Sequence, residues 1–234
     1  MTFPRANCDP ADINALAGSY SFDGNVNEFF RNHPDWQDHP TPGVINDAVF
    51  KQHGGKLEFE VPSASMAASE AWKTWHQSLP NDRSWKISAK FEVPDRWTSG
   101  ENPDYQNGIG LFAGKPGGYT VFEIDFLAVA EGMRAINSQN IQDRHGGDPN
   151  YVVMAIPPDT ARISMQLMYC DSDNSVSIYF NNDQRVDTQP IGENGLFDWS
   201  MSEQFDVGII GFSEGPASTS DLLSADDWKV YMQD

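Results

Sequence analysis

Two acidic residues, Glu123 and Asp125, stand two positions apart in the stretch at residues 119–126. Successive side chains of a β-strand point to opposite faces, so both carboxylates would share one face with Tyr119. The opposite face would be apolar, with Phe122, Ile124 and Phe126. A pair of carboxylates that faces away from a core can transfer protons, bind polar ligand groups or simply remain solvated. The chemistry of this pair therefore depends on the elements around it.

Those elements are β-strands, because apolar and polar residues alternate with a period of two from about residue 56 onwards. Helical periodicity is poor, although residues 63–77 fit one short helix. Long loops are expected at residues 127–150 and 186–204, and a hairpin turn at residues 116–118. The expected strands are residues 56–61, 85–93, 108–113, 119–126, 163–169, 176–180, 205–212 and 227–231.

These strands predict an all-β fold with antiparallel sheets, in a single domain over residues 1–234 whose residues 1–19 form an N-terminal arm. Alternation places Trp85 in the core, and the position of Trp228 in the last strand does the same. The sequence contains no run of about 18 apolar residues, so we expect no transmembrane segment. Its first residues also lack the charged and apolar blocks of a signal peptide.

The charge balance is strongly acidic. The chain has 34 acidic and 15 basic residues, a formal charge of -19 at pH 7, which repels phosphate backbones and disfavours nucleic acid as a partner. The two cysteines, Cys8 and Cys170, lack the CxxC spacing of a metal or redox motif. Two buried thiols are the favoured interpretation, and one bridge from the terminal arm is the alternative. The oligomeric state does not follow from the sequence.

Four short segments together resemble a known superfamily. They are residues 20–24 followed by Trp36, residues 54–59, residues 122–126 and residues 224–231. Their order is similar to that of the concanavalin A-like lectin/glucanase superfamily, particularly the family 16 glycoside hydrolases and related non-catalytic sugar-binding domains. The resemblance implies a two-sheet antiparallel jelly-roll sandwich, with a concave sheet that binds a glycan across exposed aromatic and polar side chains.

The resemblance also gives the carboxylate pair a meaning. In family 16 hydrolases a strand reading Glu-x-Asp-x-x-Glu supplies nucleophile, helper and acid/base, and Glu123 and Asp125 match the first two. Leu127 and Ala128 stand where the acid/base belongs, and neither can move a proton. We therefore expect a carbohydrate-binding module that lacks catalysis. The alternatives are a glycan-cleaving enzyme with Glu123 as nucleophile and a neighbouring acid such as Glu92 as donor, or an adhesion module with no sugar site.

Aromatic side chains are the other expected contacts of a sugar, since a pyranose ring stacks its apolar face on an aromatic ring. The candidates are Trp97, Trp75 and Tyr105, which lie in segments that read as loops or strand ends, and Tyr119 beside the acids. The expected partner is a poly- or oligosaccharide. The expected location is extracellular or at the cell surface, as one module of a larger protein.

A structural calcium ion is a further implication of the resemblance. In the resembling families the ion is held by oxygen atoms from the first strand, a glycine carbonyl and an aspartate that opens the last strand. Asp23, Gly55 and Asp227 stand at the matching places. Calcium takes about six to eight oxygen ligands, which a carboxylate, a carbonyl and water would supply. The alternative is that these residues make an ordinary turn and a strand start.

Overall fold

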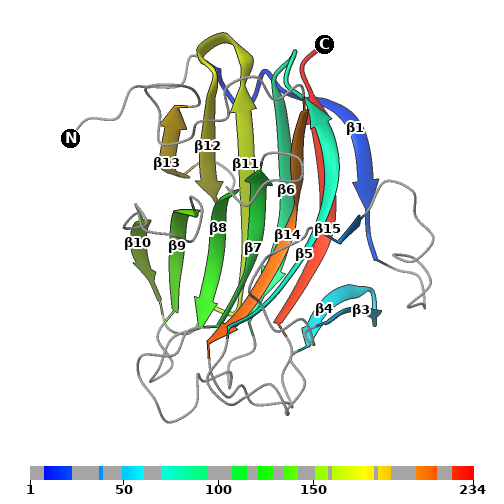
Figure 1. Cartoon of the computed structure of the whole chain (residues 1–234), viewed down its shortest axis with the longest axis vertical. Helices are drawn as coiled ribbons and strands as arrows, with labels where there is room; N and C mark the ends of the chain where they lie inside the picture. Colours follow the sequence, from blue (N-terminus) through cyan, green and yellow to red (C-terminus); the bar gives the residue numbers. More distant parts are fainter. Residues whose placement is uncertain are drawn as a thin grey trace.

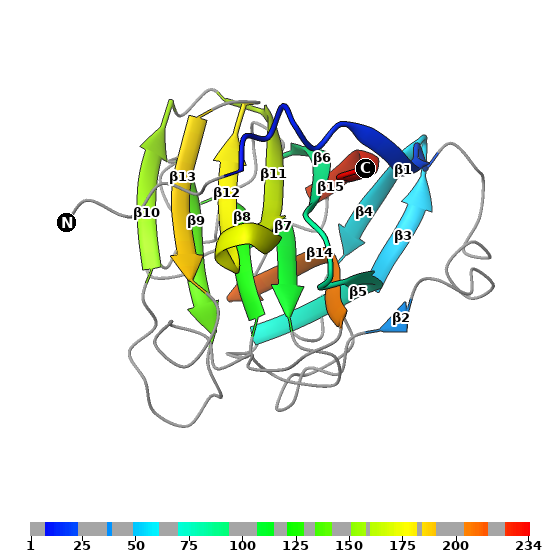
Figure 2. The same ribbon diagram turned by 90° about the horizontal axis from the view of Figure 1, so that it is seen from above.

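The chain folds into two antiparallel β-sheets packed face to face (Figure 1). The structure is a computed structural model. Figure 2 shows from above that β11 of one sheet lies beside β7 and β8 of the other. No helix in the described part of the chain is long and apolar enough to cross a membrane. The structure describes residues 8–22, 37–38, 49–60, 70–93, 107–114, 121–128, 134–141, 151–157, 160–181, 184–190, 204–214 and 223–234.

The first sheet has eight strands. Its central strand β15 pairs along one side with β6, and along the other side first with β4 and then with β1. A 3-10 helix at Asp171–Asp173 joins β11 to β12. The strand order is β13 (Gln184–Pro190), β12 (Ser175–Phe180), β11 (Arg162–Cys170), β6 (Trp85–Glu92), β15 (Leu223–Met232), β4 (Lys56–Glu60) and β3 (Val49–His53), with β1 (Ala15–Tyr20) also on β15.

The second sheet has seven strands, and β8 lies in its interior between β7 and β9. Its order is β10 (Tyr151–Ile156), β9 (Arg134–Ile141), β8 (Val121–Ala128), β7 (Asn107–Gly114), β14 (Gln204–Glu214), β5 (Glu70–Pro80) and β2 (Gln37–Asp38). The strand that carries the two acids is therefore held by neighbours on both sides.

The core lies between the two sheets and follows the alternation of the sequence. In β6 every second residue is buried, from Trp85 onwards, and the residues between them are partly or fully exposed. Trp85 and Trp228 are both buried, as the sequence predicts. Side chains of β7 and β14, such as Leu111 and Ile209, complete the core from the seven-stranded sheet.

One close approach between the sheets requires a glycine. The Phe59 ring of β4 lies over Gly211 of β14, and a Cβ atom at Gly211 would come within 2.5 Å of the ring. Gly211→Ala is expected to lower the free energy of unfolding by about 1–3 kcal/mol through overpacking, measured by urea denaturation. Gly18→Ala is the matched control, because a Cβ atom there meets nothing within 4 Å. Equal midpoints for Gly211→Ala and the wild type would contradict this packing.

Most of the expected strands are present, but three expectations about the rest of the chain are wrong. Residues 70–77 belong to β5 rather than to a helix, because this Trp- and Thr-containing segment pairs along its length with β14. The expected loop at 127–150 contains β9, and β13 begins before the expected loop at 186–204 and extends into it. Within the expected arm at 1–19, residues 15–19 are part of β1 and pair with β15.

The two cysteines form a disulfide, so the expectation of buried thiols is wrong. Cys8 and Cys170 are bonded, with 5.8 Å between their Cα atoms. Residues 8–14 cross the outer face of the eight-stranded sheet, where Ile13 packs against Met168 and Tyr179. Further contacts hold this segment, including a 2.8 Å hydrogen bond from Lys86 Nζ to the Pro10 carbonyl. This packing holds residues 8–14, the terminal arm, against β11.

Candidate functional site

The strand β8 places Glu123 and Asp125 on the side of the seven-stranded sheet away from the core. Ile124 lies opposite Leu111 in the register, and Leu111 is a buried core residue. Directly opposite positions share a face and adjacent ones alternate, so Glu123 and Asp125 take the outer face. This is the placement that the alternation of residues 119–126 predicts.

Two amide residues of β9 lie directly opposite the two acids. Gln139 pairs with Glu123, and Asn137 pairs with Asp125. Residues directly opposite in an antiparallel pair have Cβ atoms about 4.5–5.5 Å apart. The outer face therefore has two acids and two amides at neighbouring positions, which we call the acid–amide cluster. Sequence reasoning missed the two amides because it assigned their segment to a loop; the polar run at residues 137–140 gave no core pattern.

The other neighbours of the acid–amide cluster are apolar or small. Glu123 lies opposite Phe112 of β7, and Asp125 lies opposite Gly110, which in turn pairs with Ile210 of β14. Phe112 and Ile210 are 0% and 1% exposed although both stand on the outer-face side of their strands. The outer face over β7 and β14 is therefore closed to solvent at these two residues.

A third acid on the same face is too far away to complete a catalytic pair. Asp206 of β14 is buried and accepts a 2.9 Å hydrogen bond from Ser78 Oγ. It lies two strands and two residues from Glu123, about 12 Å from the spacings of a sheet. Carboxylates of a retaining glycosidase lie about 5–5.5 Å apart and those of an inverting one about 6.5–9.5 Å. The outer-face position of β8 that follows Asp125 is Leu127, whose side chain has no titratable group.

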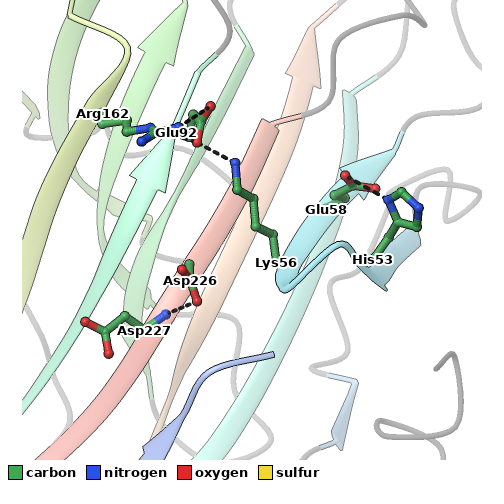
Figure 3. Close-up of polar contacts among 7 residues, drawn as sticks. All are labelled: His53, Lys56, Glu58, Glu92, Arg162, Asp226 and Asp227. Carbon is green, nitrogen blue, oxygen red and sulfur yellow. Dashed lines mark hydrogen bonds and ion pairs between the residues drawn. The ribbon is translucent and has the colours of Figure 1, made fainter. Parts of the chain in front are cut away.

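Glu92 cannot serve as the missing proton donor, which corrects the expectation for an enzyme. It lies on β6 of the eight-stranded sheet, whereas Glu123 lies on β8 of the other sheet. Both occupy the outer faces, so the whole core separates them. Glu92 instead accepts hydrogen bonds from Lys56 Nζ at 2.5 Å and from Arg162 Nε at 3.0 Å (Figure 3).

The aromatic candidates divide into two groups. Trp97, Tyr105 and Tyr119 lie outside the described residues, so their roles stay predictions. Trp75 is on β5, opposite Ile209, and in phase with the buried Leu79. This register position belongs to the core side of the sheet and not to the side of Glu123 and Asp125.

The calcium candidates are partly visible. Asp23 lies outside the described residues, and Gly55 lies in the turn between β3 and β4 with φ 78°. The Asp227 carboxylate accepts hydrogen bonds from Lys90 Nζ at 2.9 Å and from Lys229 Nζ at 2.7 Å. Burial by itself would raise the pKa of Asp227, but these two hydrogen bonds lower it below its usual value.

Asp227 therefore does not fit a calcium ligand in this arrangement, because two ammonium groups already neutralise it. The described residues contain no group of three or more His, Cys, Asp or Glu side chains that could hold a metal ion. The calcium ion stays a prediction of the resemblance.

Comparison with known proteins gives similarity in structure only. No family model matches the sequence, and no curated protein matches it. The CBM2 module of the evolved Dit of Lactobacillus casei BL23 phage J-1 superposes with a TM-score of 0.60 at 9% identity, covering 94% of this chain and 96% of that one. The family 16 endo-β-1,3(4)-glucanase SCLam gives a TM-score of 0.60 at 10% identity, covering 94% and 91%.

A lectin is also similar in structure, with a lower TM-score. Lectin II from Ulex europaeus gives a TM-score of 0.53 at 12% identity, covering 94% of this chain and 100% of that one. At these identities the likeness concerns the fold, which is the concanavalin A-like jelly-roll sandwich that the sequence resemblance implies.

Proposed function

We propose that this chain is a non-catalytic carbohydrate-binding domain whose acid–amide cluster binds a poly- or oligosaccharide. The observation that carries the proposal is the register of β8 and β9, which sets Glu123 and Asp125 beside Gln139 and Asn137. Carboxylates accept hydrogen bonds, and amides both donate and accept them, so the four groups match the hydroxyl groups of a sugar.

Absence of catalysis is part of the proposal. Leu127 stands at the outer-face position of β8 that follows Asp125, and Asp206 and Glu92 are too distant to act with Glu123. The similar solved structures include lectins and a carbohydrate-binding module as well as glucanases, which supports sugar binding more broadly than hydrolysis. The Cys8–Cys170 disulfide supports an extracellular or cell-surface location, because disulfides persist in oxidising compartments.

A glycan array followed by isothermal titration calorimetry tests this proposal. The wild type is expected to bind at least one neutral glycan, and Glu123→Gln and Asp125→Asn are each expected to weaken it about tenfold, the effect of one charged hydrogen bond. Asp82→Asn is the matched control, since Asp82 is exposed and lies in the turn after β5. If no glycan binds, or if all three variants bind like the wild type, the proposal is wrong.

The enzyme alternative has its own readout. Reducing-sugar release from a panel of polysaccharides is expected to stay at the level of a blank reaction. Release that Glu123→Gln abolishes would show a glycan-cleaving enzyme and contradict the non-catalytic part of the proposal, while leaving the sugar-binding part intact.

A further inference from the structure

The outer face of the eight-stranded sheet contains two adjoining hollows of about 460 and 360 Å³. They share Lys90 and Ser164, so they form one groove. The outward residues of β6, from Lys86 to Glu92, lie along its length, which is about 20 Å at the rise of a strand. We call it the β6 groove. Its charged lining residues are Lys56, Lys86, Lys90, Arg162, Lys229, Glu92, Asp226 and Asp227.

The β6 groove is positive in a strongly negative chain. Five basic and three acidic side chains line its described part, a net charge of +2, whereas the chain has 15 basic and 34 acidic residues in all. Salt screens charges beyond about 8 Å at physiological ionic strength, so a ligand in the groove responds mainly to the local groups. The groove therefore attracts anions although the whole protein repels them.

The acids of the β6 groove hold its cations in place without neutralising all of them. Glu92 is shared by Lys56 and Arg162, and Asp227 is shared by Lys90 and Lys229 (Figure 3 shows the Glu92 contacts). Burial would raise the pKa of Glu92, but the hydrogen bonds from Lys56 and Arg162 lower it, so Glu92 is ionised at neutral pH.

The cations keep donors for a ligand. The Arg162 and Lys90 side chains are 75% and 65% exposed. A guanidinium group has five N–H donors and an ammonium group has three, more than the hydrogen bonds to Glu92 and Asp227 use. An anionic ligand group can therefore bind without breaking the ion pairs.

An uncharged group in the β6 groove indicates what else the ligand carries. Gln166 lines the groove, and its Oε1 atom is buried without a hydrogen-bond partner. A buried acceptor without a donor is unfavourable, and a hydroxyl group would satisfy it once the amide of the partly exposed Gln166 turns toward the groove. Ser88 and Ser164 line the same stretch. The groove thus combines cations for an anion with positions suited to hydroxyl groups.

We propose that the β6 groove is a second ligand site, which binds an acidic oligosaccharide through its carboxylate or sulfate groups and its hydroxyl groups. The site lies on the opposite side of the sandwich from the acid–amide cluster and does not depend on it. At one end the groove is limited by the terminal arm, because Lys86 donates to the Pro10 carbonyl and lies 4.8 Å from the centre of the Tyr231 ring.

Calorimetric titration with three oligosaccharides of equal length tests the proposal: a galacturonic acid oligomer, a sulfated oligomer and a neutral glucose oligomer. At least one acidic oligomer is expected to bind the wild type, and the neutral oligomer is expected not to bind in the β6 groove. Arg162→Gln is expected to weaken the acidic oligomer about tenfold, and added salt is expected to weaken it further. Arg83→Gln removes the same charge at an exposed turn and is expected to change the affinity less than about twofold.

Two further variants separate this site from others. Gln166→Met is expected to weaken the acidic oligosaccharide but not inorganic sulfate, because only the sugar supplies a hydroxyl donor. Glu123→Gln is expected to leave acidic-oligosaccharide binding unchanged, so failure of the acid–amide cluster and failure of the β6 groove are told apart. The proposal is overturned if neither acidic oligomer binds, or if Arg162→Gln and Arg83→Gln change the affinity equally. It is also overturned if a polyglutamate peptide binds as tightly as the acidic oligomer and Arg162→Gln weakens both to the same extent.

Discussion

Cys8→Ser is expected to lower the free energy of unfolding by about 3–5 kcal/mol. The disulfide joins residues separated by 162 positions. In the chain-entropy account, a cross-link that closes so long a loop raises the free energy of the unfolded state by about 5 kcal/mol, because it lowers the entropy of the unfolded chain. The arm has other anchors, since Ile13 packs against Met168 and Tyr179, so it is expected to stay folded but to open more readily. Urea denaturation measures the loss.

The controls for this prediction are substitution of the other cysteine and reduction of the bond. Cys170→Ser and the double variant are expected to lose about as much as Cys8→Ser, because each removes the one cross-link. Reduction of the wild type is expected to lower its midpoint to that of the variants and to leave the variants unchanged. A wild type that unfolds at the same urea concentration with and without reductant would show that the bond adds no stability.

Trp85→Ala is expected to cost about 3–5 kcal/mol, since it removes a large, fully buried side chain. Trp85 is part of an aromatic cluster that joins the two sheets. Its ring centre lies 5.7 Å from that of Tyr169 in its own sheet and 5.6 Å from that of Phe205 in the other sheet. Its indole Nε1 also donates a 3.1 Å hydrogen bond to the Pro80 carbonyl. Circular dichroism during urea denaturation measures the loss.

Trp85→Phe separates packing from hydrogen bonding, because it keeps an aromatic ring but removes the N–H donor; about 1–2 kcal/mol is expected. If Trp85→Ala does not fold, Phe205→Leu tests the same cluster from the seven-stranded sheet, with an expected loss below about 1.5 kcal/mol. A loss below about 1 kcal/mol for a folded Trp85→Ala variant would show that this cluster does not stabilise the sandwich.

The sequence predicts best those strands that have one apolar and one polar face. Strand β6 is the clearest case, since its expected range of 85–93 and its observed range of Trp85–Glu92 nearly coincide. Strands β5 and β9 were missed for a physical reason. Their residues follow no simple apolar alternation, and β5 pairs with β14, a neighbour far along the chain that local propensity does not report. Strand β9 pairs with β8, which directly precedes it, but its polar run at residues 137–140 hides the strand pattern.

The candidate site was predictable to the extent that it depends on one strand. Alternation alone places Glu123 and Asp125 together on the outer face, and the register agrees. The partners of the acids could not be predicted, because Asn137 and Gln139 come from β9, whose pairing the sequence pattern did not show. Glu92 was expected on a strand next to that of Glu123, but the two strands belong to different sheets. No sequence pattern tells which of two sheets a strand joins.

The same limit applies to the β6 groove and to the disulfide. The groove collects basic residues from β4, β6, β11 and β15, which are scattered along the chain as single charges. The disulfide forms because residues 8–14 cross the sheet beside β11, which brings Cys8 to Cys170. The sequence around either cysteine does not show this contact.

The order of the strands also determines when this protein can fold during its synthesis. Strands β14 and β15 are the last described strands of the chain, yet β14 lies between β7 and β5, and β15 lies between β6 and the β4–β1 side. Until residues 204–232 leave the ribosome, strands β5, β6 and β7 each lack a partner on one side. A nascent chain with such open edges can pair with its neighbours on a polysome, so we expect its yield to depend on chaperones that bind it before translation is complete.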